Sequence, residues 1–167
     1  METLVLKKEE KIDSGSVQCI RHTAIEKALE DSRRQYLAGN LSMPQTLPFI
    51  FDAQVECGIT SYTSYHWEAA HYHTTTTEYA YMIAGETKYV DLSSGQEYYF
   101  REGDFYVIRK DTPYIQKSKP GCKLLFFKAP GLNDKQLMES TEAMEKWCEN
   151  WETPWDGQES AKNDCKM

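Results

Sequence analysis

Three side chains that commonly bind metal ions lie within eight residues of one another: His71, His73 and Glu78. The two histidines are two positions apart, so on a β-strand both imidazoles point to the same face. Glu78 has the opposite parity, and threonines 74–77 must therefore contain a bend that lets Glu78 open a second strand and point back inward. Two imidazoles and one carboxylate on neighbouring strands can form a three-ligand site with open positions. The pattern predicts one divalent metal ion, with Fe(II) favoured and Mn, Ni, Co or Zn as alternatives; the competing interpretation is two surface histidines near an unrelated glutamate.

The elements that must position these residues are predicted to be strands. Residues 49–130 consist of short runs of β-branched and aromatic residues, separated by turn residues at regular intervals. Ten of the eleven tyrosines lie in this region, where aromatic side chains favour strands. Such spacing is typical of an antiparallel sandwich or barrel. The predicted fold class is mainly β.

The flanking segments have a different character. Residues 1–48 are predicted to be an N-terminal extension with one helix from Thr23 to Ala38, capped by Thr23 and Glu26. Residues 131–151 are predicted to pack on the barrel as a C-terminal helix that starts near Asp134, with Asn133 or Asp134 as its cap. Residues 152–167 are polar and are predicted to be a disordered tail.

Composition excludes several classes of protein. Asp and Glu number 26 against 19 Lys and Arg, which gives a net charge of −7, whereas a nucleic-acid binder needs a basic surface. No apolar run approaches the roughly 20 residues that span a bilayer, and the first residues lack the apolar core of a secretory signal. Five scattered cysteines without CxxC spacing fit reduced thiols better than disulfides or a zinc finger. We expect a cytoplasmic protein without nucleic-acid or membrane partners.

Residues 55–130 resemble the cupin superfamily. Its first motif, G-x5-HxH-x3,4-E-x6-G, is matched by His71, His73, Glu78 and Gly85, with Tyr65 in place of the leading glycine. Its second motif, G-x5-PxG-x2-H-x3-N, is matched at Gly103 only; the later positions are occupied by Arg109, Asp111, Tyr114 and Ser118. The resemblance implies a cupin-type antiparallel β-barrel, or jelly roll, and a homodimer.

Tyr114 stands where the family usually supplies a fourth metal ligand, a histidine. Its phenol oxygen could coordinate the metal, or it could stay protonated and hydrogen-bond to substrate or to metal-bound water. A phenol pKa near 10 favours the second outcome. A core aromatic is the third interpretation.

Further residues are candidates for the ligand-binding wall. Gln116 shares the parity of Tyr114, and Met82 shares that of Glu78, so both are predicted to face the barrel interior. Tyr79, Tyr81 and Ile83 have the opposite parity to Met82 and are predicted to face outward. Arg109 and Lys110 could attract an anionic substrate, although they lie beside a predicted turn.

Two other residues lie near the motif. His66 is expected to face away from His71 and to be structural. Glu68 could serve as a second carboxylate near the mouth of the barrel, but a solvated face is favoured.

The barrel hosts many reactions, so the family predicts fold better than chemistry. We expect a metal-dependent enzyme acting on a polar small molecule, of the dioxygenase or the sugar/keto-acid isomerase type. Tyr114 and Glu78 are its candidate catalytic residues; if Glu78 does not coordinate the metal, it could act as a proton-transfer base. The alternative is a noncatalytic small-molecule or sugar-binding, sensory cupin, and a storage protein ranks below both.

Overall fold

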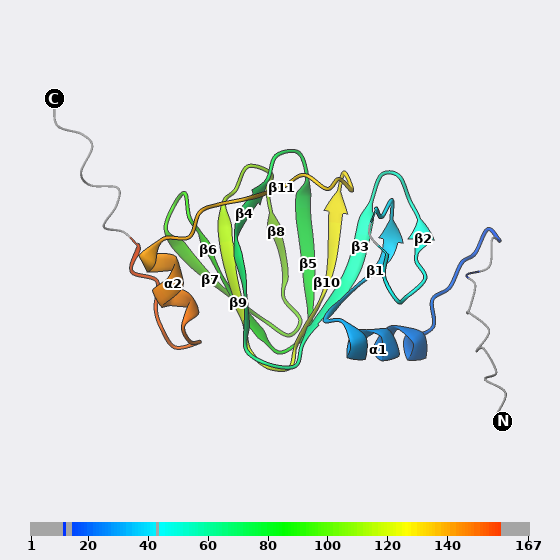
Figure 1. Cartoon of the computed structure of the whole chain (residues 1–167), viewed down its shortest axis with the longest axis horizontal. Helices are drawn as coiled ribbons and strands as arrows, with labels where there is room; N and C mark the ends of the chain where they lie inside the picture. The colour runs from blue at the N-terminus through cyan, green and yellow to red at the C-terminus, as the bar shows by residue number, and fades with distance from the viewer. Residues whose placement is uncertain (1–11, 13–14, 43, 158–167) are drawn as a thin grey trace, which may run out of the picture.

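The computed structural model describes residues 12, 15–42 and 44–157, and its framework is a barrel of two sheets (Figure 1). The first sheet has the order β2-β1-β3-β10-β5-β8, with strands Ile50–Phe51, Arg34–Gly39, Glu56–Tyr62, Cys122–Ala129, Thr77–Ala84 and Phe105–Ile108. The second has the order β11-β4-β9-β6-β7, with strands Lys135–Leu137, His66–His73, Tyr114–Ser118, Glu86–Asp91 and Gln96–Arg101. All pairings are antiparallel except that of β1 with β2. The mainly β prediction is confirmed.

The barrel interior is filled by the inward-facing side chains of both sheets. Met82 is completely buried there, among aromatic residues that the alternation of the strands turns inward. Tyr81 and Ile83, its neighbours on β5, are exposed on the outer face, as their opposite parity predicts. The main interior cluster is formed by Tyr62, Ala80, Met82, Tyr89, Tyr106, Tyr114, Cys122, Leu124 and Phe126.

Gly85 makes the tight connection between β5 and β6. Its φ is +73°, in the left-handed region that favours glycine, and an added Cβ would lie 2.6 Å from the Cα of Cys122. A side chain at this position would therefore clash with the backbone of the neighbouring turn. This explains why the chain has glycine here.

The N-terminal segment differs from its prediction. Helix α1 covers only His22–Asp31, and its N-cap residue, Arg21, makes no side-chain capping bond, so the predicted capping box is absent. Residues Arg34–Gly39, predicted as the end of the helix, form β1 and pair with β3. Pairing along β3 therefore outweighs the local helical pattern, and it turns Arg34 toward the barrel interior.

The C-terminal segment differs in the same way. The short strand β11 pairs with β4 where the predicted helix should begin, and α2 covers only Glu142–Cys148. The N-cap is Thr141, whose hydroxyl accepts a hydrogen bond of 3.3 Å from the Met144 N–H, so the cap predicted at Asn133 or Asp134 was wrong. The helix packs on the outer face of the second sheet (Figure 1).

The side chain of Lys117, on β9, binds the C-terminal end of α2 and the residues that follow it. It points outward from β9, is completely buried, and donates to the carbonyls of Trp147, Asn150 and Thr153 at 2.8, 3.0 and 2.8 Å. Its ammonium also lies 4.2 Å from the centre of the Trp147 ring. The Tyr65 hydroxyl donates to the Cys148 carbonyl at 2.9 Å, and the Trp147 ring N–H donates to Glu97 at 2.6 Å, so several side chains of the barrel hold the end of α2.

The described cysteines, Cys19, Cys57, Cys122 and Cys148, are free thiols. None of the described helices is long and apolar enough to cross a bilayer. Of the predicted tail, residues 158–167 lie outside the described part of the chain.

Candidate metal and substrate site

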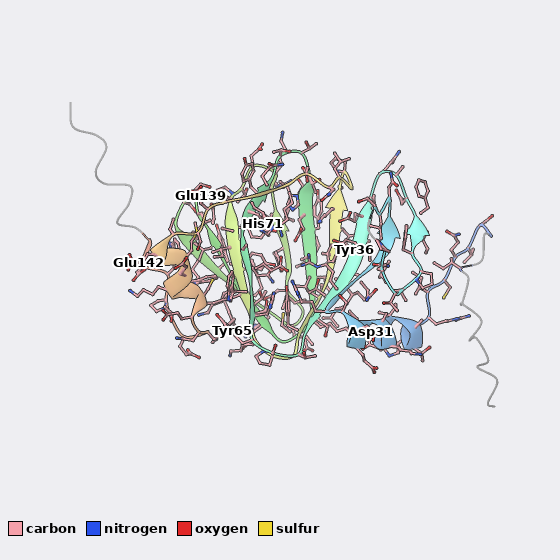
Figure 2. All side chains as sticks on the ribbon, viewed as in Figure 1. Asp31, Tyr36, Tyr65, His71, Glu139 and Glu142 are labelled. Carbon is pink, nitrogen blue, oxygen red and sulfur yellow. The ribbon has the colours of Figure 1, made fainter. Side chains whose placement is uncertain are left out.

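A small cavity of about 90 Å³ lies inside the barrel, and we call it the His chamber. It brings together the predicted site residues His71, His73, Glu78, Tyr114 and Gln116, which come from β4, β5 and β9. Figure 2 shows His71 in the middle of the molecule and Tyr36, which also lines the chamber, on β1. The remaining lining residues are Arg34, Tyr62, Glu68, Tyr89, Leu124, Phe126, Lys128, Asn133 and Lys135.

Two predicted ligand-binding residues do not line this chamber. Met82 is packed in the interior cluster with no exposed surface. Arg109 lines a separate cavity at the end of β8. His66 is half-buried and stacks on the Tyr62 ring, with the ring centres 5.3 Å apart, and it too lies outside the chamber wall.

The two histidines are held in the same way. His71 Nδ1 lies 2.7 Å from the Ala69 carbonyl oxygen, and His73 Nδ1 lies 2.7 Å from the Asp134 carboxylate. In each ring the Nδ1 then carries the proton, which leaves Nε2 with its lone pair available. Histidines that bind metal ions are usually oriented by such an acceptor on the second nitrogen.

Asp134 also holds the bend between the two ligand-bearing strands. Its second oxygen accepts hydrogen bonds from the N–H groups of Thr75 and Thr76 at 2.7 and 2.8 Å. Although burial raises the pKa of this carboxyl, these bonds and the one with His73 bring the pKa well below its ordinary value. One ionised carboxylate therefore fixes both the His73 ring and the turn that leads to Glu78.

Glu78 opens β5 opposite Ile108 of β8. Its Oε2 lies 3.9 Å from His73 Nε2, so carboxylate and imidazole face each other across the chamber. Within residues 12, 15–42 and 44–157, no three His, Cys, Asp or Glu side chains converge closely enough to form a preformed metal cage. The donor set, two oriented Nε2 atoms and one carboxylate, nevertheless has the chemistry of a 2-His-1-carboxylate site.

Tyr114 lies directly opposite His71 in the β4–β9 pairing, with the ring centres 4.4 Å apart. Burial, followed by the nearby Glu78 and Glu68 carboxylates, raises the pKa of Tyr114 well above its usual value near 10. Its hydroxyl forms no hydrogen bond with any described residue. The phenol is thus a protonated donor available to a ligand.

Burial lowers the pKa of His71 to about 4, and the positive charge of Lys135 adds to this effect. The imidazole is therefore neutral near pH 7, the form that can donate a lone pair to a metal ion. Gln116 is fixed at the chamber floor, because its amide nitrogen donates to Ser118 and Thr87 at 3.1 and 3.3 Å.

A buried ion pair that the sequence pattern did not predict forms one wall. Glu68 is 9% exposed, accepts from the Arg34 guanidinium at 2.5 Å and from the Tyr62 hydroxyl at 3.0 Å, and is not on a solvated face as predicted. Burial raises the pKa of Glu68, but the charges of Arg34 and Lys135 and the Tyr62 hydrogen bond together outweigh burial and hold the pKa well below the ordinary value.

Two lysine side chains line the chamber, and each is part of an ion pair. Lys128 pairs with Glu56 at 2.9 Å, and Lys135 lies 3.8 Å from Glu68. A larger cavity of about 450 Å³ adjoins the chamber, and four residues line both: Arg34, Tyr36, Lys128 and Asn133. Three positively charged side chains, Arg34, Lys128 and Lys135, thus line the chamber together with the carboxylates of Glu68 and Glu78.

Solved structures with a similar fold share little sequence with this chain. DMSP lyase DddQ from Ruegeria pomeroyi DSS-3 has a TM-score of 0.50 at 14% identity, over 63% of this chain and 50% of that chain. KdgF from Halomonas sp. has 0.48 at 14% identity, over 60% and 80%. An uncharacterised protein with a double-stranded β-helix domain from Klebsiella pneumoniae has 0.46 at 17% identity, over 53% and 78%. No protein-family model and no curated protein sequence matches the chain.

The likeness to these structures concerns the fold alone. The chain has the cupin-type double-stranded β-helix, the jelly roll that its HxHx4E motif predicts.

Proposed function

We propose that His71, His73 and Glu78 hold one divalent metal ion, Fe(II) favoured. We further propose that the chamber is the active site of an enzyme that moves a proton on a small anionic molecule such as a hydroxy acid or keto acid. The observation that carries this proposal is the matched orientation of the two imidazoles, each with Nδ1 bound to an acceptor at 2.7 Å and Nε2 left available. The bound ion would supply a Lewis acid for a substrate oxygen.

The surrounding side chains have complementary roles. Glu78 turns Oε2 toward His73, where it would complete the three-ligand site. A Glu78 carboxylate that does not coordinate the ion would instead be the base that accepts a proton from a substrate carbon. The protonated Tyr114 hydroxyl donates to the substrate oxygen that gains negative charge. Arg34, Lys128 and Lys135 attract the anionic group of the substrate.

The first experiment is metal analysis of protein purified without chelator and without a nickel column. We expect about one metal ion per chain, lost in His71→Ala and His73→Ala and retained in His22→Ala, a control on the exposed face of α1. Full occupancy in the His71→Ala, His73→Ala double variant, or metal-free wild-type protein of unchanged stability, would contradict the proposal.

The second experiment identifies the reaction class. Hydrogen–deuterium exchange at the α-carbon, followed by NMR over a panel of small hydroxy and keto acids, detects proton transfer directly. We expect exchange that is lost in Glu78→Gln. Oxygen consumption on thiols, catechols or diketones without such exchange would instead establish the dioxygenase alternative. Metal binding without either reaction would leave the noncatalytic binding protein.

A further inference from the structure

A second cavity adjoins the His chamber and shares two lining residues with it. It has a volume of about 210 Å³ and is walled by aromatic residues of β7 and β8, chiefly Tyr98, Phe100 and Tyr106; we call it the side chamber. Tyr89 and Tyr114 line both cavities, so their rings form the partition between them. Apart from Tyr114, the residues that line the side chamber take no part in the function proposed above.

Its aromatic wall is ordered by ring contacts. Phe100 and Tyr106 stack with ring centres 4.0 Å apart and planes 4° apart, which joins an edge strand of one sheet to an edge strand of the other. Tyr98 continues the series, 6.3 Å from Phe100 at 8°, and is 45% exposed. The Tyr106 hydroxyl donates to that of Tyr89 at 2.9 Å. The cavity therefore offers a preformed flat surface for another ring.

One unneutralised positive charge lies on the lining of this cavity. Arg109 is exposed, and no acidic side chain of the described chain forms an ion pair with it. Asp91, the acidic residue in the lining, already accepts hydrogen bonds from Ser93 and Ser94. The adjacent Lys110, by contrast, pairs with Asp111 at 3.8 Å. The guanidinium thus has its planar set of donors free for a carboxylate.

We propose that the side chamber is a binding site for a small aromatic carboxylate. The ring of this ligand packs on the Tyr98 and Phe100 surface, and its carboxylate pairs with Arg109. Drug-sized ligands occupy cavities of roughly 300–1,000 Å³, so a chamber of about 210 Å³ suits a single ring. Because Tyr114 forms part of both walls, an occupant here also contacts the back of the His chamber.

Calorimetric titration with three probes tests both parts of the recognition. Benzoate carries the ring and the charge, benzamide the ring alone, and cyclohexanecarboxylate the charge without the aromatic face. We expect benzoate to bind at least about tenfold more tightly than either of the others. Arg109→Gln should weaken benzoate binding about tenfold or more, Arg109→Lys should restore part of it, and Tyr98→Ala should weaken it several-fold. Arg101→Gln, a charge change at the last residue of β7 that does not line the side chamber, should leave it unchanged.

The outcomes distinguish this site from the His chamber. Benzoate binding that persists in the His71→Ala, His73→Ala double variant supports a separate site, whether or not that variant has lost a metal ion. Benzoate binding that survives Arg109→Gln, or that disappears in the histidine double variant, overturns the inference. So does the absence of benzoate binding to the wild-type protein at millimolar concentration. Backbone amide shifts on benzoate addition that are largest at the residues lining the side chamber, on β7, on β8 and at Arg109, would locate the ligand independently.

Discussion

Glu68 and His71 are three residues apart on β4, yet both line the His chamber. On a regular strand, residues three apart face opposite sides. In this protein, Glu68 pairs with Gln116 and His71 with Tyr114, so three steps on β4 match two on β9. The extra residue is a β-bulge at Ala69 and Ala70. This bulge places the carboxylate that neutralises Arg34 beside the imidazole predicted to bind metal.

We expect loss of the Glu68–Arg34 ion pair to lower the free energy of unfolding. Glu68→Gln removes the negative charge and leaves the half-buried Arg34 guanidinium beside a neutral amide. Breaking one partner of a buried pair commonly costs about 3–5 kcal/mol. We expect urea denaturation to give a free energy of unfolding lower by about 3 kcal/mol. Glu142→Gln, an exposed control on α2, should change it by less than about 0.5 kcal/mol; equal effects of the two variants would refute a structural role for the pair.

We expect Asp134 to raise the metal affinity of the site, although it is not itself a metal ligand. Asp134→Asn keeps an oxygen for the Thr75 and Thr76 N–H groups but removes the charge that orients His73. Loss of such a partner typically lowers metal affinity about 10–100-fold. Titration with Co(II), followed by its visible absorption, should show this weakening, whereas the nearby exposed variant Glu139→Gln should match the wild type. An unchanged affinity in Asp134→Asn would mean that His73 needs no such support.

We expect substitution of Met82 to change the free energy of unfolding and to leave metal affinity unchanged. It has no exposed surface and packs in the interior cluster, away from the chamber wall. Met82→Ala should lower the free energy of unfolding by about 2–5 kcal/mol through the cavity it leaves. Met82→Leu, which conserves volume, should cost less than about 1.5 kcal/mol. Co(II) affinity should be the same in all three proteins; a selective loss of binding in Met82→Leu would instead assign Met82 to the site.

Because Lys117 is buried, we expect the free energy of unfolding to depend on pH. Burial lowers the pKa of Lys117 from 10.5 to about 8. Between pH 8 and 10.5 the unfolded chain therefore binds this proton more strongly than the folded chain does, so the contribution of Lys117 to the free energy of unfolding rises with pH.

We expect the difference in unfolding free energy between wild type and Lys117→Met to grow by on the order of 2 kcal/mol across this window. Urea denaturation at several pH values measures it, with the exposed variant Lys27→Met as control. A difference that is constant with pH, or that shrinks as pH rises, would contradict a lowered pKa.

The sequence by itself determined the barrel and the centre of its site. Alternating β-branched and aromatic residues with regular turns predicted the strands, and the two-residue spacing of His71 and His73 predicted their common face. Both are local properties, because strand periodicity depends only on the backbone of one segment. The same periodicity correctly turned Tyr81 and Ile83 outward and Met82 inward.

The tertiary structure decided everything that depends on pairing between distant segments. Arg34 lies in a helical pattern by sequence, but hydrogen bonding to β3 makes it a strand residue and directs it into the chamber. Glu68 reaches the same chamber only through a bulge, whose one local sign is the pair of small residues Ala69 and Ala70. Asp134, which resembles a helix cap, instead orients His73 from 61 residues away. Local periodicity carries no information about which strand pairs with which, so the His chamber was predictable in its histidines and not in the charges that surround them.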